Sequence, residues 1–163
     1  MKISLAALFT LLFLGWATTR IVMDINFGRN CTGYLKRAAD ANTVPMAAKN
    51  LETAVRYAET NGLTSGYTSI LYRSPSEDIG FWYENLTASL KELKEITPET
   101  TQLERTNVLM KLRETLLDQG ENGVHVTAPS GLSVYPSNTA FALWGCLSLI
   151  FAGVFWIAGA MDL

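Results

Sequence analysis

The sequence is poor in the residues that most often carry chemistry. It has one histidine and two cysteines among 163 residues. It contains no G-x-x-x-x-G-K-[ST] loop, no G-x-G-x-x-G element and no C-x-x-C pair. His125 lies in a segment rich in proline and glycine, without the neighbouring acid or nucleophile that a catalytic histidine requires. We therefore expect a protein that is not an enzyme and that binds no cofactor and no metal.

Positive charge is also scarce. Thirteen Lys and Arg residues stand against fifteen Asp and Glu residues, which gives a formal net charge of −2. A nucleic-acid-binding protein needs a basic surface, because neutralisation of phosphates supplies most of its affinity. No basic cluster of the kind that binds anionic lipid headgroups is visible either. These absences exclude nucleic acid from the expected partners.

The two ends of the chain carry only three charged residues between them. Outside the stretch 24–121 the charged side chains are Lys2, Arg20 and Asp162. The segments 1–23 and 139–161 are otherwise apolar and close to the length of about 20 residues that a helix needs to cross a bilayer. The sequence therefore predicts an all-α membrane protein, in which two transmembrane helices flank an extramembrane bundle of about four helices. The lipid bilayer is its first expected partner.

The segment 1–23 is open to two interpretations. Lys2 and the apolar run after it also fit a cleaved signal peptide, but no A-x-A pattern precedes Arg20. We expect an uncleaved signal anchor. Lys2 favours a cytoplasmic amino terminus, so two crossings place both termini in the cytoplasm and residues 24–138 in the periplasm of a bacterial inner membrane.

Helix boundaries divide the segment 24–138. A first helix over 32–41 is expected to continue the first membrane helix, with an interruption near Gly28 and Gly33. Thr43 and Pro45 start a second helix that ends at Asn61-Gly62. The stretch 62–73 is expected to form a loop that packs on the domain through its tyrosine, isoleucine and leucine side chains.

Two further helices complete the predicted bundle. Ser74, Pro75 and Glu77 form a capping-box pattern for a third helix that runs to about Ile96. Its predicted apolar face consists of Ile79, Trp82, Tyr83, Leu86, Leu90 and Leu93. Thr97-Pro98 is expected to start a fourth helix, which the glycines at 120 and 123 end. The predicted apolar positions of this helix are Leu103, Leu109, Met110, Leu112, Leu116 and Leu117. Residues 123–138 contain two prolines, which forbid a long helix, and the alternation of Val124 with Val126 and of Leu132 with Val134 permits short extended pieces. We expect a semi-ordered linker that packs on the bundle and leads back into the membrane.

Two features of the sequence are candidates for contact with a partner. Phe81, Trp82 and Tyr83 are consecutive on the third helix and point in three directions, so at least one aromatic ring must find cover outside the core. Ser148 and Ala152 are four residues apart in the second membrane helix, a spacing of small residues that lets another helix approach closely. An anchor within the fold is the alternative for the aromatic run, and a lipid-facing helix is the alternative for the small pair.

Two classes of function fit this architecture. The first is a non-enzymatic accessory or scaffold subunit of a larger membrane complex, which presents a helical domain outside the cytoplasm to other membrane subunits or to itself. The second is a ligand-binding, sensor-type input module that lacks its own output domain, and that resembles bacterial receptor input domains in layout. We expect the first. A stoichiometric protein partner would support it, whereas a polar, ligand-sized cavity in the bundle would favour the second.

Overall fold

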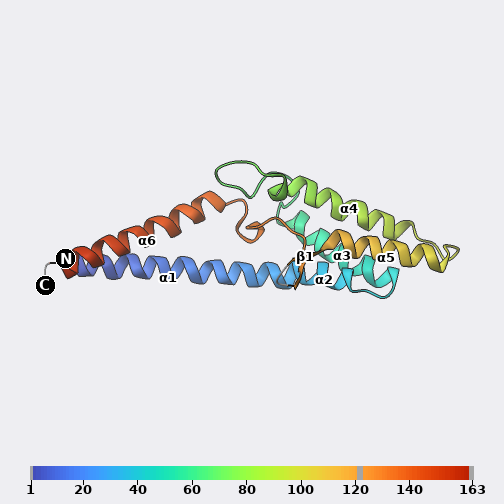
Figure 1. Ribbon diagram of the computed structural model, residues 1–163, viewed down its shortest axis with the longest axis horizontal. Helices are drawn as coiled ribbons and strands as arrows, with labels where there is room; N and C mark the ends of the chain where they lie inside the picture. The colour runs from blue at the N-terminus through green and yellow to red at the C-terminus, as the bar shows by residue number, and fades with distance from the viewer. Residues whose placement is uncertain (1, 121–122, 162–163) are drawn as a thin grey trace. The chain divides into compact units, whose positions relative to one another are not determined.

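The first apolar segment forms one continuous helix with the start of the central domain. A computed structural model describes residues 2–120 and 123–161, and these are mostly helical (Figure 1). Helix α1 (Lys2–Phe27) passes through a π-helical turn (Gly28–Thr32) into α2 (Gly33–Ala39). The predicted continuation and its interruption near Gly28 and Gly33 are therefore confirmed. A Cβ on Gly33 would lie 2.8 Å from the carbonyl oxygen of Gly28, so the turn requires glycine at residue 33.

The second apolar segment forms α6 (Asn138–Ala160), as predicted. Within the described residues, α6 and the helix that begins at Lys2 are the two helices long and apolar enough to cross a membrane. Their large side chains are exposed rather than packed in a core: Leu11 is 66% exposed and Ile157 is 65% exposed. The length and the apolar composition of both helices thus fit membrane-spanning segments.

The chain separates into two compact units, one of Met1–Ile25 with Ser133–Leu163 and one of Asn26–Leu132. In the first unit α1 and α6 run in opposite directions (Figure 1). Phe9 stacks on Phe155 with 5.7 Å between ring centroids, and Trp16 Nε1 donates a hydrogen bond of 2.9 Å to the carbonyl oxygen of Phe141. Aromatic side chains of α1 therefore fill the space beside the small residues of α6.

The second unit is built on α3 (Val44–Thr60), which begins and ends where the sequence predicts. The Thr43 side chain accepts a hydrogen bond from the backbone N–H of Met46, and proline lies in the first turn. One face of α3 is buried, at the spacing of three and four residues that an amphipathic helix shows. Its buried residues are Val44, Ala47, Leu51, Ala54, Val55 and Ala58.

Helix α4 (Ile79–Glu95) begins later than predicted. The expected capping box at Ser74 is wrong, because Pro75–Glu77 forms a separate 3-10 turn and the backbone leaves helical geometry at Asp78. The Asp78 side chain instead caps α4 by accepting from the N–H of Phe81 at 3.1 Å. The predicted apolar face is confirmed, since α4 buries Ile79, Trp82, Leu86, Leu90 and Leu93.

Helix α5 (Gln102–Leu116) also differs at both ends. Thr97-Pro98 does not start it; Thr101 does, through a capping box in which Glu104 bonds back to the Thr101 backbone. The helix stops at Leu116, before the glycines that were expected to end it. Of its predicted apolar positions, Leu112 and Leu116 are buried, whereas Leu103 and Met110 are exposed.

The prediction of an all-α domain is wrong in one place. Strand β1 (Leu117–Gly120) pairs antiparallel with β2 (Gly123–Val126), from Leu117 opposite Val126 to Gly120 opposite Gly123. Gly123 has φ +111°, a conformation that favours glycine. Residues 123–126 thus form one of the short extended pieces that the sequence permits here, paired with β1, and a 3-10 turn (Leu132–Val134) follows in the same segment.

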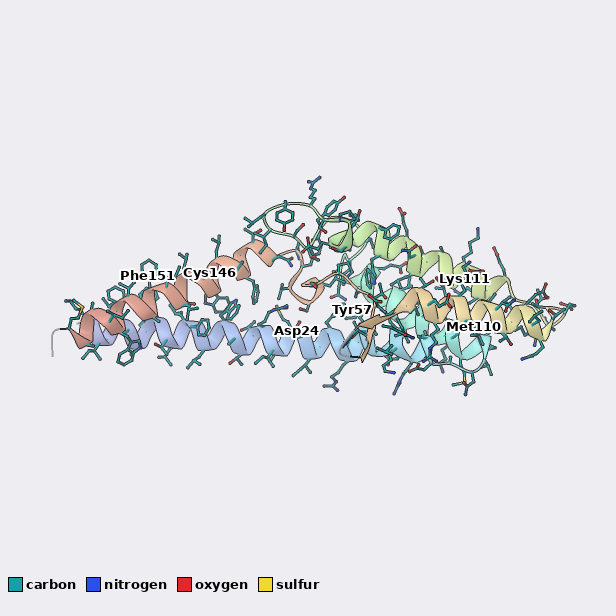
Figure 2. The ribbon with its side chains drawn as sticks, viewed as in Figure 1. Asp24, Tyr57, Met110, Lys111, Cys146 and Phe151 are labelled. Carbon is teal, nitrogen blue, oxygen red and sulfur yellow. The ribbon has the colours of Figure 1, made fainter. Side chains whose placement is uncertain are left out.

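The helices of the second unit alternate in direction, so the unit has two ends. At one end, here called the junction end, the chain enters at Asn26 and leaves at Leu132. The ring of Phe27 lies 6.1 Å from that of Tyr57, which is near the end of α3 (Figure 2 labels Tyr57). Trp82, near the start of α4, bonds to Thr127. The opposite end, the distal end, holds the connections α2–α3 and α4–α5.

Candidate functional site

A cleft of about 780 Å³ lies at the distal end of the second unit. Its walls come from the α2–α3 connection, the α4–α5 connection and one side of α5. The lining residues are Ala39, Asp40, Ala41, Asn42, Thr43, Val44, Pro45, Ile96, Thr97, Pro98, Gln102, Arg105, Thr106, Leu109, Met110 and Arg113. Ligand pockets in proteins measure about 300–1,000 Å³, so the cleft has the size of a small-molecule site.

Arg105 builds one wall of the cleft. Its Nη2 donates hydrogen bonds to the carbonyl oxygens of Thr97, at 3.1 Å, and Pro98, at 2.6 Å. These bonds fix the α4–α5 connection to α5 and keep the cleft open beneath it. The Nε of the same side chain is buried with no hydrogen-bond partner among the described residues. A buried donor without a partner is costly, so Arg105 gains from a nearby acceptor.

Asp40 and Arg113 face each other across the cleft. Lys36 Nζ lies 2.5 Å from Asp40 Oδ2, whereas Arg113 Nη2 lies 4.0 Å from Asp40 Oδ1, beyond hydrogen-bonding distance. The hydrogen bond from Lys36 lowers the pKa of Asp40, and the charges of Lys36 and Arg113 add to that effect. Asp40 is thus ionised at neutral pH and already matched by Lys36. The pKa of Glu99 is lowered mainly by a hydrogen bond with Thr97 and also by the positive charge of Arg105, so Glu99 partly balances Arg105. Arg113, 4.0 Å from Asp40, is the less closely matched of the two arginines.

The remaining lining groups are either apolar or uncharged and polar. Val44, Pro45, Ile96 and Leu109 supply apolar surface, and several threonine, asparagine and glutamine side chains supply hydrogen-bonding groups. A cleft of this composition suits a ligand with an apolar body and an anionic or hydrogen-bond-accepting group. Among the described residues, the lining shows no nucleophile paired with a base.

The aromatic run predicted as a partner contact is divided by the structure. Trp82 is 5% exposed, and its Nε1 donates to the carbonyl oxygen of Thr127 at 3.0 Å. The hydroxyl of Tyr83 donates to Glu59 Oε1 at 2.8 Å, and this hydrogen bond raises the pKa of Tyr83. Phe81 is 62% exposed. Two of the three rings thus hold the domain together, and Phe81 is the one that lies open to a partner.

The pair of small residues lies on a covered face of α6. Ser148 is 4% exposed and Ala152 is 8% exposed within this single chain. The Ser148 hydroxyl bonds within its own helix, to the carbonyl oxygen of Trp144 at 2.7 Å. Gly145 and Gly159, on the same face, each lie against a side chain of α1, respectively Trp16 and Ile3. The close approach that the small residues allow is made here by α1, and their contact with another subunit stays a prediction.

Sequence reasoning did not find the cleft. The α5 residues that line it share an arc of about 140°, which mixes charged, polar and apolar side chains. They are Gln102, Arg105, Thr106, Leu109, Met110 and Arg113. Two arginines eight residues apart were the available indication, but a solvated helix face shows the same pattern. The described residues contain no group of three or more His, Cys, Asp or Glu side chains placed to hold a metal ion.

Comparison of the chain with protein-family models, with curated proteins and with solved structures finds no match.

Proposed function

We propose that this chain is a membrane-anchored binding protein whose helical domain takes a small ligand in the distal cleft and passes its occupancy to a partner protein. The observation that carries this proposal is the cleft of about 780 Å³ with Arg105 and Arg113 on its wall. A ligand-sized cavity with polar groups is the feature that distinguishes a sensor-type input module from a simple scaffold. The cleft thus reverses the preference that the sequence suggested.

Anchoring is the second part of the proposal. Two apolar helices, α1 and α6, cross the membrane, and the unit Asn26–Leu132 stands outside the cytoplasm with both termini inside. The exposed apolar surface of both helices supports this arrangement, because such surface is stable in lipid and costly in water. Lys2 favours a cytoplasmic amino terminus, which supports this orientation. We propose a bacterial inner membrane as the host.

The ligand that fits is an organic anion with an apolar body. Arg105 and Arg113 present guanidinium groups, which recognise carboxylate or phosphate by paired hydrogen bonds. Leu109, Met110 and Pro45 line the remaining surface. Occupation of the cleft would bridge α5 to the α2–α3 connection, and α2 continues without a break into α1. A change at α2 therefore has a direct helical route toward the membrane segment.

The test is native mass spectrometry of the full chain, isolated in mild detergent from its own membrane. The proposal expects a small molecule that co-purifies with wild type, is lost from Thr106→Trp, which fills the cleft, and is weakened in Arg113→Gln. Lys91→Trp is the matched control, because Lys91 is 79% exposed on α4 and does not line the cleft. Equal ligand content in the wild-type, Thr106→Trp and Lys91→Trp proteins would refute the cleft as the site.

An accessory subunit is the second candidate, supported by exposed apolar residues of α5 and α3. Leu103 is 70% exposed and Met110 is 56% exposed, and their spacing of seven puts them on one face of α5. Met46, on the first turn of α3, is 56% exposed as well. In the same purification, a stoichiometric protein partner that is retained in Thr106→Trp but lost in Leu103→Glu would favour this function over the first.

A further inference from the structure

The connection between α3 and α4 forms a loop that is closed at its base. The backbone N–H of Thr68 donates to the carbonyl oxygen of Glu77 at 3.1 Å, and that of Ile79 donates to Gly66 at 2.9 Å. Residues 69–76 therefore form a tongue whose two arms are tied together. The guanidinium carbon of Arg73 lies 5.1 Å from the centroid of the Tyr67 ring, a cation–π contact that braces the tongue near this base.

The tip of this tongue is apolar and uncovered. Leu71 is 90% exposed, Tyr72 is 77% exposed and Ile70 is 47% exposed. A single exposed leucine is ordinary on a protein surface, but three successive large apolar side chains at the end of a tied loop are not. The sequence analysis expected these residues to be covered by the domain. The structure turns them outward, so what covers them must come from elsewhere.

The tongue emerges from the junction end of the second unit. It leaves α3 just after Tyr57, whose ring lies against Phe27, and it enters α4 just before Trp82, which bonds to Thr127. The chain enters this unit at Asn26 and leaves it at Leu132, and both of these covalent connections lead to the apolar helices α1 and α6. The cleft, by contrast, lies at the other end of the same bundle.

We infer that the tip of this tongue, residues 70–72, inserts into the interface of the bilayer to which the chain is anchored. The inference depends on the proposed membrane anchoring and not on the cleft. Both covalent connections to the apolar helices leave the second unit at its junction end. The order of side-chain types along the tongue also fits a lipid surface. Aliphatic side chains lie at the tip, a tyrosine follows, and Arg73 comes next, where it can meet lipid phosphates. Three anchors in place of two would fix the tilt of the domain on the membrane.

The test places a fluorescent probe at the tip in the intact protein. The full chain, reconstituted in nanodiscs of equimolar phosphatidylcholine and phosphatidylglycerol, carries the environment-sensitive dye NBD on Leu71→Cys in a Cys146→Ala background. Cys31 is buried, and the Cys146→Ala parent must take up no dye. Quenching by doxyl-labelled lipids reports direct contact with lipid. Leu103→Cys in the same background is the matched control, because it too replaces an exposed leucine, at the side of α5.

A dye on native Cys146, which is exposed on α6 (Figure 2), reports the anchoring separately. We expect strong quenching at residues 71 and 146, a blue-shifted emission at residue 71, and neither effect at residue 103. If the dye at residue 146 is quenched and the dye at residue 71 behaves like the dye at residue 103, the inference about the tongue is wrong and the anchoring stands. Absence of quenching at 146 would overturn the anchoring itself. A blue shift at 71 without lipid quenching would show that a protein covers the tip, and equal quenching at 71 and 103 would show that contact with lipid is not specific to the tongue.

Discussion

Substitution of Gly145 by alanine should separate α1 from α6. A Cβ at this position would lie 2.6 Å from Trp16 Cε2 and 2.9 Å from Cζ2, well inside van der Waals contact. The indole ring cannot simply turn away, because its Nε1 is bonded to the carbonyl oxygen of Phe141. Overpacking of this kind costs about 1–3 kcal/mol, and loss of the hydrogen bond adds about 1 kcal/mol.

An opposing term reduces this cost. Alanine is favoured over glycine within a helix by about 1 kcal/mol, so the net destabilisation expected for Gly145→Ala is about 1–3 kcal/mol. Gly153→Ala is the matched control, since a Cβ on Gly153 would have no heavy atom within 4 Å. That variant should be as stable as wild type or slightly more stable.

Unfolding of the full chain by SDS in mixed micelles, followed by tryptophan fluorescence, measures the difference. Trp16→Leu removes the ring that the new methyl group meets, so Gly145→Ala should cost little in that background, and the two substitutions should be far from additive. Equal midpoints for Gly145→Ala and Gly153→Ala, or full additivity with Trp16→Leu, would show that the packing of α1 on α6 described here is incorrect.

Three more predictions concern the second unit. Gly33→Ala should lower the melting temperature of the domain, because its Cβ would meet the Gly28 carbonyl oxygen at 2.8 Å and the π-helical turn would have to unwind. Gly28→Ala is the control, since the nearest atom to its Cβ would be 3.9 Å away. Equal melting temperatures for the two variants would show that the turn does not require glycine at residue 33. Trp82→Phe removes the hydrogen bond to Thr127 and should destabilise the domain by about 1 kcal/mol, with faster hydrogen exchange in strands β1 and β2. Unchanged exchange in these strands would mean that the bond does not hold them. The pKa of Asp40 is lowered by Lys36, so its contribution to stability is present above the unfolded value of about 3.9 and is lost as pH falls through the folded pKa. Thermal melts at pH 7 and pH 3 should therefore show a smaller acid-induced loss in Asp40→Asn than in wild type, and identical losses would exclude this contribution.

The sequence by itself determined the elements with strong local patterns. The two apolar segments are helical, as their length and their lack of charge predict. The predicted start and end of helix α3 are confirmed, because the signals at its start, Thr43 with Pro45, and at its end, Asn61-Gly62, act within a few residues. The apolar face of α4 followed from its spacing alone.

Boundaries that depend on competition between two local patterns were not determined in this way. Ser74 and Asp78 both precede a plausible first turn, and the pairing of Thr68 with Glu77 and of Ile79 with Gly66 decided for Asp78. Thr97 and Thr101 compete in the same manner, and Thr101 prevailed because Glu104 completes its capping box. In the first case the deciding partner is distant in the sequence.

Only the tertiary structure decided what the exposed residues can do. Leu71, Leu103 and Met110 read as core residues in the sequence, and they are exposed because no other helix covers the tip of the tongue or that side of α5. The cleft arises where two connections and one face of α5 meet, with Pro45 on one wall and Ile96 on the other 51 positions apart along the chain, and Arg105 holds the far wall by bonds to backbone oxygens. The periodicity of a sequence indicates which face of a helix is apolar, but it does not indicate which helix faces pack together. A cleft forms where the packed faces leave a gap.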